Sequence, residues 1–476
     1  MRKLKKDFTC SGIWWQPNDP DDKIHGTLYY SYQNGLKLEL KDVFKSKKRN
    51  GEHIDVKTPL ILGISDKGKN ITLFGCGYAG GPGGFRKIDK STVRGYQFSN
   101  YLCSAAYVPH HFLSENEIKF KKINFRLTYL DEWLKISGFK VSREGDNENQ
   151  DIKINIEYSL PKPIVIKLDE DFTMSIIFYY EDPGFYPQSK CKLIQYSIVS
   201  LESNNEIKLT DFLKYITQIR YFFSLAIMKP IYPYNFSGQI ISETSDVYNS
   251  HTSIFMRLDE NLKVKGAVDP YSTLLEYSQI QNQFEELFQN WFKKQKLLEP
   301  VIDLYFSIFF NPEMPINNQF LGAVQAIESY HRRFKKNEVM DKTEFKKLKN
   351  NILDALLEDQ KIWLKPKLDF ANEPSLYYRL TDLFSEYCEL GHIFGFNRDD
   401  FARKVTYTRN YLTHYSSNLE KKSYSGTDII KATQQLKAII QYLILIELGI
   451  TRVDAQKYAN NISRNQLSRR FITFTL

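Results

Sequence analysis

Cysteine is scarce in this sequence and follows no pattern. The cysteines number five, and none stands in the Cys-x-x-Cys spacing that is typical of zinc and redox sites. This excludes a cysteine-rich metal module, and we expect reduced thiols in a cytoplasmic protein. The five are Cys10, Cys76, Cys103, Cys191 and Cys388.

Long apolar runs are also absent. The N-terminus begins with basic residues, but polar and glycine residues follow where a secretory signal would place its apolar segment, so we expect no export. The longest apolar stretch, Ala438 to Ile450, is interrupted by Gln441 and Glu447 and is shorter than the roughly 20 residues that cross a bilayer. We therefore expect a buried helix there and no membrane contact.

Aromatic residues, in contrast, are abundant. The chain of 476 residues has 33 Phe and 31 Tyr. So much apolar area can offset the conformational entropy of ordering the backbone, and we expect a folded protein. The length exceeds one ordinary core and favours two or three domains. A net charge of +9 is compatible with a polyanionic partner, but many proteins that bind no nucleic acid share it.

Residues 1–205 have the pattern of a β-rich domain. Aromatic and β-branched residues alternate with polar ones, which is the period of half-buried strands. Turn signals such as Asn34-Gly35 and Asp66-Lys-Gly68 separate these segments and favour an antiparallel sandwich or barrel over a βαβ array. The alternating segments include Gly26-Thr-Leu-Tyr-Tyr-Ser-Tyr, Leu36-Lys-Leu-Glu-Leu and Ile152-Lys-Ile-Asn-Ile-Glu-Tyr.

Helical spacing begins near Thr210 and dominates the rest of the chain. Residues 206–310 are predicted to form a connector, with a helix before Pro230, a β-like or loop segment over 236–268, and helix again from Tyr271. Residues 311–476 are predicted to form an all-helical bundle, so the expected fold class is α+β. The expected helices of this bundle cover about 318–337, 341–359, 376–392, 399–415, 428–448 and 451–466.

One short segment of the helical region carries residues suited to RNA cleavage. In Arg409-Asn-Tyr-Leu-Thr-His414, the His follows the Arg at the fifth position. A neutral His414 can take the proton of a ribose 2′-hydroxyl, whose oxygen then attacks the adjacent phosphate, while Arg409 donates forked hydrogen bonds to the developing charge. Asn410 would orient the phosphate or the imidazole, because it lies four residues before His414 on one helix face. This chemistry requires no metal and no other cofactor.

On an ideal helix, however, Arg409 and His414 do not share a face. At about 100° per residue they lie roughly 140° apart. A two-fold dimer would bring two copies of each side chain around one cleft, and its two histidines could act as base and acid. The alternative is a structural role, in which Arg409 is a surface or salt-bridging residue and the dipole at a helix C-terminus stabilises His414.

The segment from Arg409 to His414 resembles the Arg-polar-x-x-x-His signature of HEPN-domain ribonucleases. Upstream, the segment Phe320-Leu-Gly-Ala-Val-Gln-Ala-Ile-Glu-Ser-Tyr-His331 resembles the helix that carries a Glu in that fold. The N-terminal half is similar to the sensor-like domain of ApeA-type anti-phage proteins. The similar segments there are Gly12-Ile-Trp-Trp, Gly26-Thr-Leu, Leu130-Asp-Glu-Trp-Leu134, and Leu201 followed by Leu209-Thr-Asp-Phe-Leu213.

This resemblance implies a function. It implies metal-independent cleavage of RNA, either tRNA or another cellular RNA, by a homodimer or higher homo-oligomer that forms through the helical domain. Cleavage would arrest the growth of an infected bacterium after a phage-derived trigger reaches the β-rich domain. The other function that we consider is a non-catalytic helical module for dimerisation and nucleic-acid binding.

Two features near the motif stay open. Glu328 lies close to the inner face of its helix and would then need a cationic partner, for which we expect Arg409, although a surface Glu is equally compatible with the pattern. The basic stretch from Arg332 to Lys336, followed by further lysines at 346, 347 and 349, lines either an RNA path or a solvated helix face.

Other patterns resemble ligand sites but lack the residues to complete them. Two Glu-x-x-His pairs, beginning at Glu328 and Glu389, have di-iron spacing, but Gly391 interrupts the second. The pair His110-His111 has only Cys103 as a soft neighbour, which is too few ligands for zinc. We therefore expect no metal.

The glycine-rich segment from Gly75 to Gly84 contains a GxGxxG string. Pro82 follows that string and no helical pattern succeeds it, so a dinucleotide site is not indicated. We expect an inter-strand loop there.

Overall fold

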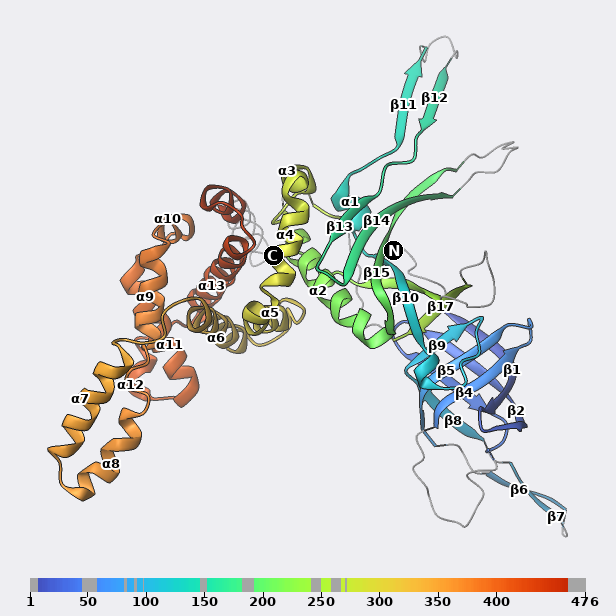
Figure 1. Ribbon diagram of the computed structural model, residues 1–476, viewed down its shortest axis with the longest axis horizontal. Coiled ribbons are helices and arrows are strands. Elements are labelled where there is room, and N and C mark those ends of the chain that lie inside the picture. Colours follow the sequence, from blue (N-terminus) through green and yellow to red (C-terminus); the bar gives the residue numbers. More distant parts are fainter. Residues whose placement is uncertain are drawn as a thin grey trace. The chain divides into compact units, whose positions relative to one another are not determined.

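The computed structural model forms two compact units, the first from residues 1–224 and 231–268 and the second from residues 225–230 and 269–476. The first unit is built from antiparallel strands and the second from helices, which confirms the predicted α+β class (Figure 1). The described residues are 7–44, 58–80, 84–89, 92–96, 98–145, 152–181, 192–240, 250–257, 267–269 and 272–460.

Six strands of the first unit close into an antiparallel ring, the barrel-like arrangement among those predicted. Neighbours pair in the order β5-β4-β1-β2-β3-β8, and β8 also pairs with β5. Alternate side chains point inward, as the period of two requires, and they bury Trp14, Leu28, Leu38 and Tyr101 in one apolar cluster. The strands are β1 (Phe8–Gln16), β2 (Asp19–Ser31), β3 (Gly35–Leu40), β4 (Thr58–Ser65), β5 (Asn70–Tyr78) and β8 (Ser99–Cys103).

The large sheet continues from β5 through the strands that do not join the ring. Helix α2 (Leu209–Ile227) packs on this sheet. The ring of Phe172, in the sheet, contacts the rings of Phe212 and Tyr215 in the helix. In sheet order these strands are β9 (Ala105–Val108), β17 (Ser250–Met256), β16 (Pro233–Ile240), β10 (Lys119–Leu127), β15 (Ile194–Lys208), β14 (Phe172–Glu181) and β13 (Ile164–Lys167).

Smaller elements complete the first unit. They are the helix α1 (Leu130–Leu134) and two hairpins, β6 (Gly84–Asp89) with β7 (Thr92–Tyr96) and β11 (Phe139–Glu144) with β12 (Lys153–Tyr158). The glycine-rich segment is only partly a loop, since Gly75 and Gly77 belong to β5 and Gly84 begins β6. Residues 81–83 lie outside the described residues, and the next described element is a strand and not a helix.

The second unit is a helical bundle around α13 (Gly426–Glu447). This helix is apolar and long enough to cross a membrane, but 67% of the stretch is buried inside the structure, where it packs against α5 (Gln295–Phe309) and α6 (Ile316–Phe334). Gln441, which interrupts the apolar run, donates a hydrogen bond to the Tyr305 hydroxyl at 2.7 Å. The predicted buried helix is therefore a core helix with a satisfied polar group.

The other helices of this unit follow the predicted segments except at three elements. The segment predicted as one helix over 376–392 divides at Tyr387, and helical spacing predicted neither α8 (Glu358–Leu368), none of whose residues is buried, nor the short α12 (Ser417–Glu420). Residues 461–466 of the last predicted helix lie outside the described residues. The helices are α3 (Tyr277–Ile280), α4 (Phe284–Lys293), α5 (Gln295–Phe309), α6 (Ile316–Phe334), α7 (Lys342–Asp354), α8 (Glu358–Leu368), α9 (Leu376–Glu386), α10 (Glu389–Phe394), α11 (Arg398–His414) and α12 (Ser417–Glu420), and residues 452–460 are also helical.

Candidate functional site

Helix α11 carries the Arg-Asn-x-x-x-His segment. It begins after Asn397, whose side chain accepts hydrogen bonds from the backbone amides of Asp399 and Asp400 in an N-cap. It ends at His414, because Tyr415 adopts the left-handed conformation with φ 50° and its backbone N–H donates a hydrogen bond to the Tyr411 carbonyl. The buried face of this helix consists of Phe401, Ala402, Val405, Thr408 and Leu412.

The motif residues differ in exposure and in partners. Arg409 and Asn410 are half-buried, and His414 is exposed. Nη1 of Arg409 donates to the side-chain oxygen of Asn410 at 3.1 Å, and the Thr413 hydroxyl donates to the Arg409 carbonyl at 2.8 Å. Among the described residues no carboxylate forms an ion pair with Arg409, so its guanidinium keeps donors for a ligand.

A pocket of about 400 Å³ lies between α6 and α11. From α11 it is lined by Arg409 and Thr413, and from α6 by one continuous face that runs from the apolar Leu321 to the polar Arg332. Glu328 lies on that face. The structure thus brings together two of the residues that the sequence singled out, Arg409 and Glu328.

His414 is not among the residues that line this pocket. Helix α11 stays regular up to His414, so the separation of roughly 140° from Arg409 remains. The sequence pattern did not indicate Thr413 and Ser329 as lining residues, and it left the role of Arg332 open. Helical spacing could have indicated Thr413 and Arg332, because they follow Arg409 and Glu328 by four residues.

The carboxylate of Glu328 pairs with Arg332 and not with Arg409, which corrects the expected pairing. Oε1 of Glu328 lies 3.4 Å from Nη2 of Arg332, and the Glu328 side chain is 19% exposed. Residues four apart on one helix reach each other without help from the fold, which favours Arg332 over a residue of another helix. Nη1 of Arg332 also lies 2.7 Å from Oε2 of Glu373, so two carboxylates share this guanidinium.

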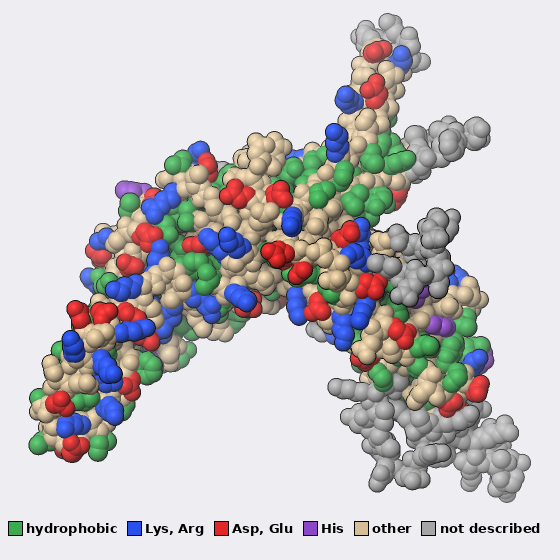
Figure 2. Space-filling model, viewed as in Figure 1, with side chains coloured by type: hydrophobic (Ala, Val, Ile, Leu, Met, Phe, Trp, Pro, Cys, Tyr) green, Lys and Arg blue, Asp and Glu red, His purple; other side chains and the backbone are tan. Residues whose placement is uncertain are grey.

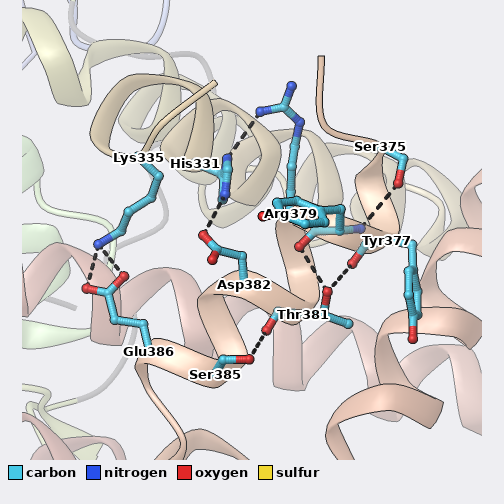
Figure 3. A network of polar contacts seen from close by, with 10 residues as sticks. His331, Lys335, Ser375, Tyr377, Arg379, Thr381, Asp382, Ser385 and Glu386 are labelled. Carbon is cyan, nitrogen blue, oxygen red and sulfur yellow. Dashed lines mark hydrogen bonds and ion pairs between the residues drawn. The ribbon is translucent and has the colours of Figure 1, made fainter. Parts of the chain in front are cut away.

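Beside these ion pairs, a buried polar network joins α6 to α9 (Figure 3). Nη1 of Arg379 donates to Nδ1 of His331 at 3.1 Å, and Nε2 of His331 donates to Asp382 at 3.0 Å. Because an arginine only donates, Nδ1 must be the acceptor and the imidazole proton must sit on Nε2. Burial lowers the pKa of His331, which keeps the ring neutral. His331 therefore has a structural role between two charged side chains.

Two of the other candidate ligands have protein partners. Glu389 accepts a hydrogen bond from the Tyr442 hydroxyl, and Nε2 of His111 bonds to the carbonyl of Gly63 at 2.8 Å. Over the part of the chain that the structure describes, no group of three or more His, Cys, Asp or Glu side chains could hold a metal ion. Neither the di-iron spacing nor the His110-His111 pair therefore corresponds to a formed site.

The basic stretch after Glu328 does not form one surface. Arg332 lines the pocket, whereas Arg333 donates to the backbone carbonyl of Lys296 and Lys335 pairs with Glu386. Figure 2 shows basic and acidic side chains intermingled over the helical unit. Arg332 is thus the member of the stretch that the structure brings to the candidate site.

Comparisons with known proteins agree with this architecture. The family model for ApeA N-terminal domain 1 matches residues 9–291, which is more than half of the chain, and the family model for Apea-like HEPN matches residues 321–454. No curated protein and no solved structure matches the chain significantly. HEPN domains are generally associated with ribonuclease activity, and the matches fit an anti-phage defence protein. The chain therefore belongs to the ApeA family, in which an ApeA N-terminal domain precedes an ApeA-like HEPN domain.

Proposed function

We propose that this protein is a metal-independent endoribonuclease of anti-phage defence and that the pocket between α6 and α11 is part of its catalytic site. One observation carries the proposal: within the matched HEPN region, Arg409 lines a pocket without a carboxylate partner among the described residues. A cation held in a pocket and not neutralised by protein is suited to an anionic ligand such as a phosphate.

The proposed chemistry divides between the motif residues. His414 takes the proton from a ribose 2′-hydroxyl, and the resulting oxygen attacks the adjacent phosphorus while the bond from phosphorus to the 5′-oxygen breaks. The protonated His414 of a second copy gives a proton to that 5′-oxygen, so that the leaving strand ends in a 5′-hydroxyl and the other end becomes a 2′,3′-cyclic phosphate. Arg409 stabilises the charge that develops on the phosphate oxygens. Asn410, which accepts a hydrogen bond from Arg409, holds the guanidinium in orientation.

A second copy of the chain completes this site. In one chain, His414 is exposed at the end of α11 and faces away from the pocket-lining side of the helix. Two copies whose α11 helices meet across a two-fold axis would place each His414 beside the other copy's Arg409. We therefore propose a homodimer, or a higher homo-oligomer, that forms through the helical unit and acts on tRNA or another cellular RNA.

We propose that the β-rich unit binds a phage-derived trigger. Its hairpin β11–β12 exposes Val141 and Ile156, which lie opposite each other in the register, together with Ile154 on the same face. Exposed apolar side chains gathered on one face favour a contact with another protein. The trigger would then release the ribonuclease in the cytoplasm of the infected bacterium, and the cell would stop growing.

The proposal is tested with the purified full chain, unfractionated cellular RNA and EDTA. We expect the RNA to be cut in EDTA, with 2′,3′-cyclic phosphate at the new ends, and an all-2′-deoxy strand to stay intact because it lacks the nucleophile. Cutting that requires a divalent metal, or cutting of the deoxy strand, would refute the mechanism. Binding of RNA with no cutting, in protein from infected cells as well, would favour the non-catalytic dimerisation and nucleic-acid-binding module.

A further inference from the structure

We propose that Arg332 is a second phosphate-binding residue of this pocket and takes the phosphate next to the one that Arg409 contacts. The inference rests on the proposed function, because it names how the same pocket holds a single RNA strand. Arg332 comes from α6 and Arg409 from α11, so the two guanidinium groups reach the pocket from different helices. This arrangement suits successive phosphates of one flexible strand.

Arg332 keeps hydrogen-bonding capacity for such a ligand. Its side chain is 42% exposed, and its two ion pairs within the described part of the chain use Nη1 towards Glu373 and Nη2 towards Glu328. A guanidinium has five N–H donors, so these two carboxylates leave donors for a third acceptor. The contact with Glu328, at 3.4 Å, is also longer than an ordinary charge-assisted hydrogen bond, and a phosphate oxygen can compete with it.

The carboxylate of Glu373 links Arg332 to the buried Arg379. Nη2 of Arg379 lies 3.8 Å from the Glu373 carboxylate that also binds Arg332, and Arg379 itself is 0% exposed and bonded to His331. Among the described residues, Nε and Nη2 of Arg379 have no hydrogen-bond partner. Burying a cation so incompletely bonded costs stability, and its contact with Glu373 fixes the carboxylate that binds Arg332.

The charges of the pocket lining favour an anion. The lining contains two arginines, Arg332 and Arg409, and one carboxylate, Glu328, which leaves an excess of one positive charge there. Glu328 therefore orients Arg332 without cancelling the positive potential at the pocket. A pre-oriented arginine also loses less side-chain entropy when it binds a phosphate.

The test measures the affinity of the full chain for a 5′-labelled single-stranded RNA and for its all-2′-deoxy analogue over a range of salt concentrations. The variants are Arg332→Gln, Arg332→Lys and, as a matched control, Arg403→Gln, which removes an exposed arginine of α11 outside the pocket lining. We expect Arg332→Gln to weaken both ligands about tenfold, since a charge-assisted hydrogen bond is lost, and to reduce the salt slope by about 0.7. Arg332→Lys should restore the slope, and Arg403→Gln should leave affinity and slope near the parental values.

Two results would overturn the assignment of Arg332. One is parental affinity and slope in Arg332→Gln, and the other is an equal loss in Arg332→Gln and Arg403→Gln, which would mean general attraction by positive charge. Thermal unfolding of each variant controls for damage to the Glu373 network. The proposed function is tested separately, because binding of the deoxy analogue does not depend on cleavage. Absence of RNA cutting by the parental chain would refute the proposed function without deciding the role of Arg332.

Discussion

Glu328 on α6 and Arg409 on α11 line one pocket, yet the carboxylate of Glu328 pairs with Arg332 and not with Arg409. The guanidinium of Arg409 is thereby left to the Asn410 side chain and to a ligand. The two helices that line the pocket therefore have different proposed roles. In the proposed mechanism α11 provides the reacting groups, and α6 provides Arg332 and the carboxylate that orients it.

His414→Ala is expected to abolish RNA cutting without loss of stability. The side chain is exposed at the end of α11, so its removal opens no cavity, whereas loss of a general base costs at least about two orders of magnitude in rate. Single-turnover cleavage and thermal unfolding measure the two effects. His392→Ala removes another exposed histidine of the helical unit and serves as the control. Parental cleavage by His414→Ala would exclude His414 as the base.

Arg409→Lys separates transition-state stabilisation from simple attraction. Lysine keeps the charge but loses the planar fork that contacts two phosphate oxygens together. We expect RNA affinity at fixed salt to survive while cleavage falls by roughly two or more orders of magnitude, as for the loss of one oxyanion donor. Equal losses in affinity and cleavage would show that Arg409 only holds the substrate, and near-parental cleavage would remove it from the catalytic residues.

Glu328→Ala is expected to reduce cleavage less than His414→Ala does. The carboxylate acts through Arg332, so its loss disturbs position and not the chemical step, and we expect a loss of about tenfold. The measurement is specific activity beside thermal unfolding, with Glu328→Gln as the variant that keeps shape and removes charge. A large fall in melting temperature with unchanged specific activity would make Glu328 purely structural.

The buried histidine predicts a pH dependence of stability. Burial and the nearby Arg379 lower the pKa of His331 below its ordinary value of 6.5, although Asp382 acts in the opposite direction. The unfolded chain therefore binds more protons than the folded chain below that value, and stability falls as the pH drops through this range. Between neutral pH and about pH 5, the melting temperature of the parent should fall more than that of His331→Gln. Identical pH dependence in both proteins would contradict this role.

Local patterns were sufficient to predict much of this fold. The period of two along segments such as Leu36 to Leu40 predicts strands that bury alternate side chains, and the ring of β-strands buries Leu36, Leu38 and Leu40 inward. Closure of that ring could not be predicted, because it depends on the pairing of β5 with β8, which are distant in sequence. Helix α8 was missed for another reason: Ile362 and Trp363 are exposed, so its apolar residues do not mark a buried face.

The candidate site was predictable in part. The motif on α11 was visible from the spacing of Arg409 and His414, and the position of Glu328 near an inner face followed from helical periodicity. The ion pair of Glu328 with Arg332 could have been predicted from their spacing of four residues, whereas the contacts of Glu373 with Arg332 and with the buried Arg379 could not. Those contacts join α6 to the segment before α9 and leave no local sequence signal.

The most direct test of the central claim maps 2′,3′-cyclic phosphate ends in the RNA of bacteria that express either the parental chain or His414→Ala, before and after phage infection. The account predicts that new cyclic-phosphate ends accumulate after infection with the parental chain and stay at the background level with His414→Ala at equal protein abundance. Equal accumulation in both strains, or no accumulation with the parental chain while it still protects the culture, would contradict the claim that Arg409 and His414 form an RNA-cutting site.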